Sequence, residues 1–404
     1  MAERDWNPDP GDGKSESTGR RIARARNRRG LTQTGLAARA HVSRSLIAQV
    51  ESGHKPATPA LVAAVARVCA VDPAELNGQP YRGPDRRTDA VHQAIPAIRR
   101  ALAYIDIPPE LETPPRPLNE LAAELIKLQK LQEAAAHVSL GNHLPAVIEE
   151  LTVHTMESDA PQAWRLLNHS YALAASLARR LGYNDLAQIG IERAATAAPR
   201  ADDPHLRHLV PLGRALLMLN LGFGDIALMV VRQAADDVDR SEAAGLEVYA
   251  SLHLRAAVSA ARIGRASDAW EHHGLASETA ARIDPRNRLD PYGSEVNSTN
   301  VAIHGCAVAT ELGDYDQAVR LDTDFKPPPT LYAERRAHHE IDMARTHLWL
   351  NNYDKAFKRV LKADKIAPQM TRFHPTARET VRQLGSHYRN VPEELRRLER
   401  RMTL

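Results

Sequence analysis

A repeated spacing of small residues constrains the fold of this chain from residue 118 onward. At six places a glycine, once replaced by asparagine, is followed five residues later by alanine and preceded seven residues earlier by a small residue. The glycine-equivalent positions are Gly141, Gly182, Gly222, Gly264, Gly313 and Asn351. Alanine recurs twelve residues after four of them. This part of the chain is therefore predicted to be helical and repetitive.

This spacing resembles the tetratricopeptide repeat. In that family the first small residue lets two helices approach, glycine turns the chain, and the later alanines pack the second helix. The six glycine-equivalents are separated by 41, 40, 42, 49 and 38 residues, longer than the usual repeat of about 34 residues. Pro199 and Pro368 stand where the family ends its second helix. The resemblance implies a superhelical solenoid of helical hairpins over residues 118–370.

A solenoid of this kind presents the first helix of each hairpin on a concave surface. Positions carried over from the family place several polar side chains there, between Leu216, Ile303 and Ile341. The candidate ligand-groove residues are Arg179, Asn220, Arg262, Asn300 and Arg345. Asparagine can bond a peptide backbone twice and arginine can clamp a carboxylate, so the expected ligand is a peptide or protein segment. Ordinary solvated helix positions are the alternative for any one of these residues.

A second pattern lies near the N-terminus, in residues 30–53. Leu36, Ala37, Val42, Ile47 and Val50 are spaced so that two short helices, the second started by Ser43, bury one shared side. The remaining polar residues are of the types that bond phosphates and base edges. The candidate DNA-binding residues are Gln33, Ser43, Arg44, Ser45, Gln49 and Lys55.

The region from Gly19 to Leu76 resembles the phage-repressor-like (Xre) helix-turn-helix family, whose domain has five helices. Thr32-Gln33 and Glu51-Ser52-Gly53 match its motifs. The resemblance implies an all-α DNA-binding domain in which Arg26 pairs with Glu51. His41 occupies a turn position where glycine is usual, and a positive φ there costs on the order of 1 kcal/mol.

Charge supports this interpretation. From Gly19 to Asn77 there are ten Lys or Arg residues and three acidic ones, a net charge of +7, whereas the whole chain carries +3. The rest of the chain therefore sums to −4. The basic excess lies where DNA phosphates would bind. The alternative is that the arginines of the first helix only keep it soluble.

The predicted organisation follows from these regions. Residues 1–18 are expected to be a disordered tail, 19–78 the helix-turn-helix domain and 79–117 a linker. Within the linker, residues 89–105 form an amphipathic pattern that Pro96 either kinks or starts, and this helix either covers the next domain or pairs two chains. Residues 371–404 are expected to cap the solenoid or to mediate dimerisation.

Other classes of protein are disfavoured. The chain has no run of about 18 apolar residues and no signal-peptide pattern, and Cys69 and Cys306 lie in different predicted domains. We therefore expect a cytoplasmic, nucleoid-associated protein. His272-His273 and His338-His339-Glu340 do not complete a metal motif and are interpreted as surface or groove residues. No catalytic residue, metal or cofactor is predicted.

Two functions remain open. The first is a homodimeric transcription regulator that binds double-stranded DNA and senses a peptide or protein ligand in the repeat groove. The second is an interaction scaffold that is recruited to DNA and has no small diffusible ligand. Both share the DNA-binding step.

Overall fold

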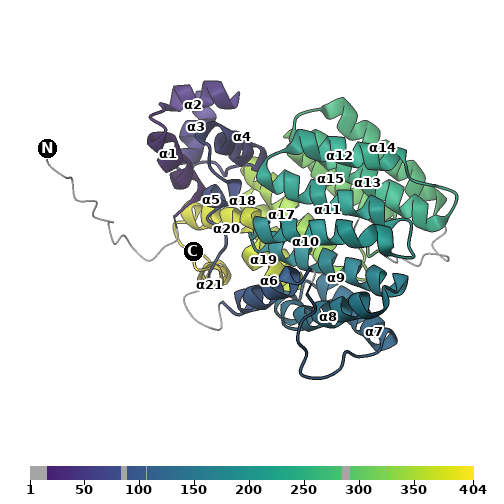
Figure 1. The fold of residues 1–404 in the computed structure, drawn as a ribbon. Coiled ribbons are helices and arrows are strands. Elements are labelled where there is room, and N and C mark those ends of the chain that lie inside the picture. Colours follow the sequence, from purple (N-terminus) through teal and green to yellow (C-terminus); the bar gives the residue numbers. More distant parts are fainter. Residues whose placement is uncertain (1–15, 83–88, 106, 284–291, 325) are drawn as a thin grey trace.

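The computed structural model describes residues 16–82, 89–105, 107–283, 292–324 and 326–404, and every regular element in these ranges is a helix (Figure 1). This confirms the all-α prediction for this part of the chain. Most of the expected tail, residues 1–15, and part of the expected linker, residues 83–88, lie outside the described residues.

The N-terminal unit consists of α1 (Thr18–Arg28), α2 (Gln33–Ala40), α3 (Arg44–Glu51), α4 (Pro59–Cys69) and α5 (Pro73–Asn77). A side-chain oxygen caps each of these helices by accepting a backbone N–H bond from its first turn. The caps are Ser17, Thr32, Ser43, Thr58 and Asp72. Ile22, Leu36, Ile47, Val65 and Leu76 form the centre of the apolar core. The predicted five-helix domain is therefore present.

The amphipathic segment predicted in the linker is divided into two helical elements close to Pro96. A 3-10 turn, η1 (Ala90–Ala94), precedes α6 (Ile95–Ala103), and Pro96 lies in the first turn of α6. Proline is tolerated there because its missing N–H would have no helical partner. Val91, Ile98 and Leu102 are buried against the first repeats, whereas Ile105 lies beyond the helix and is exposed. This segment covers the repeat domain, as one of the two alternatives predicted.

The repeat domain contains six helical hairpins, α7 to α18. Their helices are α7 (Leu118–Glu133), α8 (His137–Ser158), α9 (Pro161–Arg180), α10 (Asn184–Ala197), α11 (Leu206–Leu221), α12 (Gly224–Asp236), α13 (Ala243–Arg262), α14 (Ala266–Arg282), α15 (Ser298–Leu312), α16 (Tyr315–Thr323), α17 (Ala333–Trp349) and α18 (Tyr353–Ile366). A second 3-10 turn, η2 (Ala198–Arg200), follows α10 and contains Pro199. Pro368 likewise stands just beyond the end of α18.

Five of the six predicted hairpin turns lie where the sequence places them. The five turn residues have φ between 59° and 86°, and each stands at the junction of two paired helices. They are Gly182, Gly222, Gly264, Gly313 and Asn351. The alanines five residues after them are completely buried. Small side chains and a left-handed turn residue therefore produce these hairpins as predicted.

The prediction for the first hairpin is wrong. Gly141 lies inside α8, and the chain instead turns at Ala135, which has φ 54°. A Cβ atom on residue 141 would stand 2.8 Å from the Cβ of Ala94. Glycine is used here for close packing of α8 against the linker, which a local spacing rule does not distinguish from a turn.

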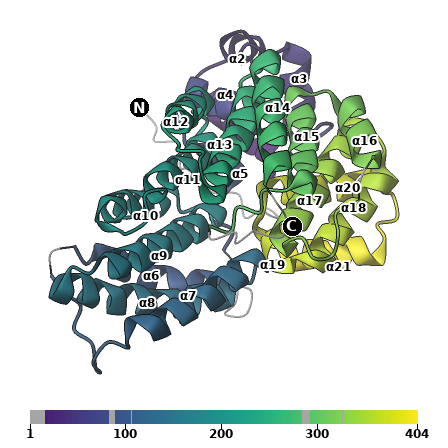
Figure 2. The same ribbon diagram turned by 90° about the vertical axis from the view of Figure 1, so that its right-hand side faces the viewer.

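The hairpins follow one another around a ring, which Figure 2 shows most clearly. After α18, the chain continues through α19 (Pro368–Phe373), α20 (Pro375–His387) and α21 (Glu393–Met402). The backbone N–H of Val138 in α8 donates to Gln369 of α19 over 2.9 Å, and Phe373 packs into the core of the first hairpins. The C-terminal helices thus join the two ends of the array, and the hairpins form a closed ring.

Candidate functional site

The recognition-helix candidate, α3, separates its apolar side from its polar side. Ile47 and Val50 are buried in the N-terminal core, while Arg44 and Ser45 are exposed. The Ser43 hydroxyl caps the helix by accepting from the Leu46 N–H over 3.1 Å. Gln49 donates to the Ser45 hydroxyl over 3.4 Å. The first turn of α3 therefore presents an exposed guanidinium and hydroxyl to solvent.

An ion pair locks α1 onto the end of α3. The Arg26 guanidinium donates to both carboxylate oxygens of Glu51, over 2.7 and 2.9 Å. This hydrogen bonding raises the pKa of Arg26. The Gln33 amide donates to the same carboxylate over 2.9 Å, so one of its donors is already in use. The structure contains the predicted Arg26–Glu51 pair and places Gln33 in a supporting role.

Lys55 lies between the N-terminal unit and the ring. Its ammonium group stands 4.8 Å from the centroid of the Trp349 ring, which in turn stacks on Tyr315. Such a cation–π contact is worth about 0.5–1 kcal/mol at an exposed site. Lys55 is therefore engaged with the repeat domain in this arrangement, and its contact with DNA stays a prediction.

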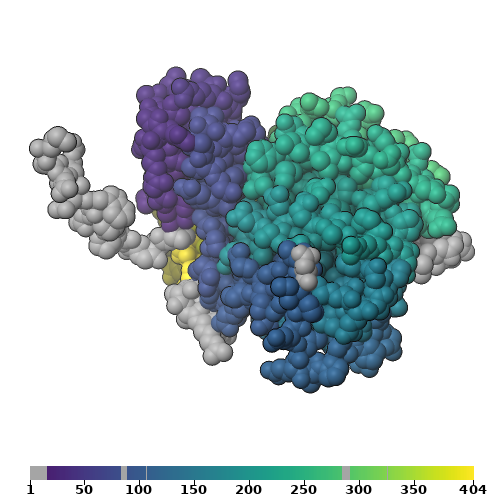
Figure 3. All heavy atoms as spheres, viewed as in Figure 1, coloured from purple at the N-terminus to yellow at the C-terminus, as the bar shows by residue number. Residues whose placement is uncertain are grey.

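The N-terminal unit also docks on the ring through α4. Arg67 donates to the carbonyl oxygen of Gly222 over 2.9 Å, at the turn between α11 and α12. A Cβ atom on residue 222 would stand 2.8 Å from the Cβ of Ala63. Figure 3 shows the N-terminal unit, in purple and blue, seated against the teal part of the ring.

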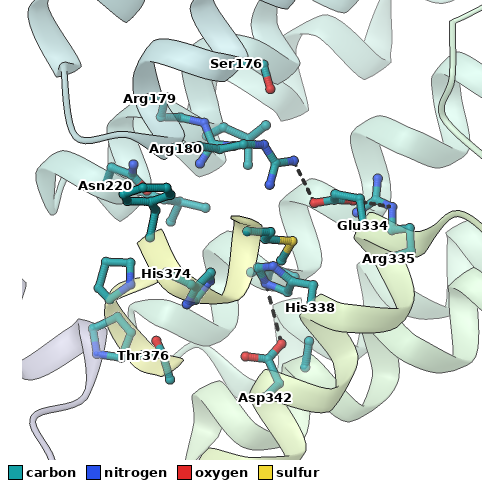
Figure 4. A pocket seen from close by; sticks show the side chains of 18 of the residues that line it. Ser176, Arg179, Arg180, Asn220, Glu334, Arg335, His338, Asp342, His374 and Thr376 are labelled. Carbon is teal, nitrogen blue, oxygen red and sulfur yellow. Dashed lines mark hydrogen bonds and ion pairs between the residues drawn. The ribbon is translucent and has the colours of Figure 1, made fainter. Parts of the chain in front are cut away.

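The ring and the N-terminal unit together line a cavity of about 450 Å³. The first helices of the hairpins, α9, α11, α13, α15 and α17, line most of it, together with α19 and α20. The N-terminal unit contributes eight lining residues: Thr18, Ala57, Pro59, Val62, Ala63, Pro73, Ala74 and Asn77. Figure 4 shows the arginines and histidines that point into this space. A ligand inside the cavity would therefore touch both units.

Two ion-pair networks stabilise the cavity wall. Glu311 accepts bonds from both Arg262 and Arg345, and this pairing holds its pKa at about 2 although burial alone would raise it. Arg180 of α9 donates to Glu334 of α17 over 2.6 Å, across the ring. These paired charges connect helices from different hairpins.

Two other arginines of the cavity have no carboxylate partner within the residues that the structure describes. They are Arg179 on α9 and Arg255 on α13. Burial lowers the pKa of each guanidinium to about 9, and the neighbouring arginines add to the effect. The Nε atom of Arg255 is buried without a hydrogen-bond partner.

The histidines of the cavity are held neutral. Burial lowers the pKa of His137 and of His374 to about 3 and that of His338 to about 4. His338 stands 3.7 Å from Asp342 (Figure 4). The cavity therefore offers hydrogen-bonding rings that carry no charge at neutral pH.

The predicted groove residues are only partly brought together. Arg179 and Asn220 line the cavity, and Arg262 and Arg345 line it but are tied to Glu311. Asn300 does not line it: the residue is buried at the start of α15, where its amide donates to the Ser294 carbonyl over 3.3 Å. The helix α15 begins only at Ser298, so Asn300 lies in the first turn of this helix.

Sequence reasoning missed Arg255 and the Arg180–Glu334 pair. Arg255 stands seven residues before Arg262, which is two helical turns, so both share one face of α13. That spacing could have identified Arg255. The Arg180–Glu334 pair joins residues 154 positions apart and leaves no local signal.

The other histidine motifs are structural. His272 contacts His253 over 3.0 Å between the two Nδ1 atoms, and His339 contacts Asp322 over 2.9 Å. Both rings are buried, so the interpretation of His272 and His339 as surface or groove residues was wrong, whereas His338 lines the cavity. Over the described ranges, no group of three or more His, Cys, Asp and Glu residues is arranged to hold a metal ion.

Residues 18–77 match the helix-turn-helix domain family. The N-terminal unit is a helix-turn-helix domain. The match covers this domain and leaves the ring outside it. No curated protein matches the chain in sequence. No helix among the described residues is long and apolar enough to cross a membrane.

A solved structure resembles most of the chain weakly. It is Bacillus thuringiensis PlcR in complex with the peptide PapR7 and DNA, at 13% identity and a TM-score of 0.33. The alignment covers 86% of this chain and 99% of PlcR.

Proposed function

We propose that this protein is a transcription regulator that reads an operator with its helix-turn-helix domain and is controlled by a ligand in the ring cavity. The observation that carries the DNA-binding step is the geometry of α3. Its buried side is locked by the core and by the Arg26–Glu51 pair, while Arg44 and Ser45 are exposed in the first turn. The local charge of +7, three acids against ten basic residues, favours DNA phosphates as the partner.

Each predicted DNA contact has a distinct role in this proposal. We expect Arg44 to form a bidentate contact with guanine, and Gln49 to bond adenine or the DNA backbone. Gln33 bonds a phosphate, and Ser43 and Ser45 contribute backbone or base contacts beside these residues. Lys55 reaches a phosphate only after leaving the Trp349 ring, so DNA binding and docking on the ring compete for this side chain.

Ligand control follows from the shared wall of the cavity. A peptide segment held by Arg179 and Asn220 would also touch α4 and α5 of the helix-turn-helix domain. A ligand shifts an equilibrium only if it binds two arrangements with different affinity, and such coupling is typically about 1–3 kcal/mol. Closure of the ring favours a short peptide segment over the large protein partner that a scaffold would need.

The DNA-binding step is tested by changing Arg44→Ala and measuring affinity for an operator selected from a random DNA pool. We expect a loss of roughly 1–3 kcal/mol on the operator and a much smaller loss on random DNA. Arg320→Ala removes the same charge from exposed α16 and serves as the matched control. Equal losses on both DNAs would show that Arg44 only contacts phosphate.

We propose further that the working unit is a homodimer on an inverted repeat. One recognition helix reads too few bases for specificity, and two-fold sites match two-fold proteins. Light scattering of the free protein and of its complex with the selected operator measures the assembly. A monomer in both samples would rule out the dimer while leaving the DNA-binding step intact.

A further inference from the structure

At one place in the cavity, the arginines carry more positive charge than the neighbouring carboxylate neutralises. Four arginines gather where α9, α13 and α17 meet: Arg179, Arg180, Arg255 and Arg335. One carboxylate, Glu334, stands among them, 2.6 Å from Arg180 and 3.9 Å from the Nε of Arg335. We call these five residues the arginine cluster; Figure 4 labels Arg179, Arg180, Glu334 and Arg335. With every guanidinium charged, its sum is three positive charges.

The other carboxylates that line the cavity do not compensate this excess. Glu311 binds Arg262 and Arg345, and Asp342 stands near Arg345 and His338. Glu379 pairs with Arg382 over 2.9 Å, and Glu133 accepts a bond from Gln129 over 3.0 Å. Each of these acidic groups therefore has a polar partner outside the arginine cluster.

The surroundings of the cluster make its charge excess costly. Mutual repulsion and loss of water both disfavour several guanidinium groups in one confined space. The low pKa of about 9 for Arg179 and for Arg255 reports this effect. His304 and His338, which lie close by, are neutral because burial lowers the pKa of each ring. A bound anion would therefore reduce the electrostatic cost of holding these guanidinium groups together.

We propose that the arginine cluster is an anion-binding subsite, in which Arg179 and Arg255 grip a phosphate or carboxylate group of the ligand. The proposal rests on the proposed function because the subsite lies in the same cavity, and it specifies the ligand as an anionic one. Guanidinium groups suit such oxyanions because they offer paired N–H donors in a fixed plane. Arg180 and Arg335 supply positive potential, and Glu334 holds them in place.

The test is isothermal titration calorimetry of the full-length protein with inorganic phosphate and with succinate, at constant ionic strength set by chloride. We expect saturable binding of at least one of the two probes. Binding of phosphate alone identifies a phosphorylated ligand, and binding of succinate alone identifies a carboxylated one. Absence of saturable binding for both probes would overturn the subsite.

Substitutions in the arginine cluster test whether the probe binds there. Arg179→Gln/Arg255→Gln should weaken the bound probe by tenfold or more, since each charged hydrogen bond is worth about 1.5–3 kcal/mol. Arg282→Gln, on the exposed end of α14, is the matched control and should bind as the unchanged protein does. Arg255→Lys keeps the charge and should still bind several-fold more weakly, because lysine lacks the planar fork. Unchanged affinity in the double variant would contradict the assignment.

Folding and DNA binding are checked in the same samples. The double variant should melt no lower than the unchanged protein in buffer free of both probes, because it loses repulsion and no ion pair. Operator binding, measured in that buffer, separates the two proposals. Anion binding without operator binding would refute the proposed regulator function and support the anion-binding subsite. Operator binding without anion binding would refute the subsite and support the DNA-binding step.

Discussion

At the scale of single residues, His41 shows how the helix-turn-helix domain tolerates a locally unfavourable choice. It ends α2 in the left-handed conformation, with φ 55° and ψ 42°, and its side chain is exposed. The usual glycine would adopt this conformation without steric penalty. We expect His41→Gly to stabilise the domain by about 0.5–1 kcal/mol. Thermal unfolding followed by circular dichroism measures the change.

Arg39→Gly is the control for this prediction. Arg39 is also exposed but lies within α2, where glycine costs roughly 1 kcal/mol of helix stability. The two substitutions should therefore shift the melting temperature in opposite directions. A decrease in both variants would mean that the His41 side chain makes a contact that outweighs the strain.

At the scale of elements, two glycine turns differ only in what lies beside them. Gly222 and Gly264 both have positive φ, 83° and 77°, and both end the first helix of a hairpin. A Cβ atom on residue 264 would meet nothing within 4 Å, whereas one on residue 222 would meet Ala63 of α4 at 2.8 Å. Gly264→Ala should thus report the backbone strain alone, roughly 1 kcal/mol.

Gly222→Ala should add a loss of docking to the same strain. We expect the helix-turn-helix domain of this variant to separate from the ring more readily, which limited proteolysis between the two units would detect as faster cleavage. Gly264→Ala should be cleaved at the rate of the unchanged protein. Equal cleavage of the two variants would show that the contact between α4 and the α11–α12 turn does not hold the domain.

At the scale of the whole molecule, helix packing buries ionisable side chains that are exposed to water in the unfolded chain. His137, His253 and His304 are at most 6% exposed. Burial lowers the pKa of His137 to about 3, that of His253 to about 4, and that of His304 well below 6.5. In the unfolded chain these rings take up protons near pH 6.5, so there the unfolded state binds more protons than the folded one.

Stability is therefore expected to fall as the pH decreases from 6.5 toward 4. The loss should be roughly 1 kcal/mol per buried histidine one pH unit below 6.5. Denaturation midpoints measured between pH 7 and pH 5 give this slope, and His137→Gln/His304→Gln should flatten it. The lowered pKa of Glu311, about 2, affects stability below pH 4.5, outside the measured range of pH 7 to pH 5. An unchanged slope in the double variant would contradict the assignment.

The amino-acid sequence by itself determined the helices, their caps and most of the turns. Ser43, Asp72 and Gly182 act on backbone groups within a few residues, so their effect can be predicted from local spacing. The same holds for Arg44, because the side of a helix on which a residue lies follows from its spacing to the buried residues. These features need no knowledge of distant contacts.

Only the tertiary structure decided how the ring closes and which charges remain unpaired. Arg179 and Arg180 are neighbours in sequence, yet only Arg180 meets Glu334, which α17 brings from 154 residues away. Gly141 matches the turn pattern but packs against Ala94 instead. Contacts of this kind depend on the summed angles of six stacked hairpins and on α19 joining their ends. These summed angles create the cavity, and they cannot be predicted from the local spacing of residues.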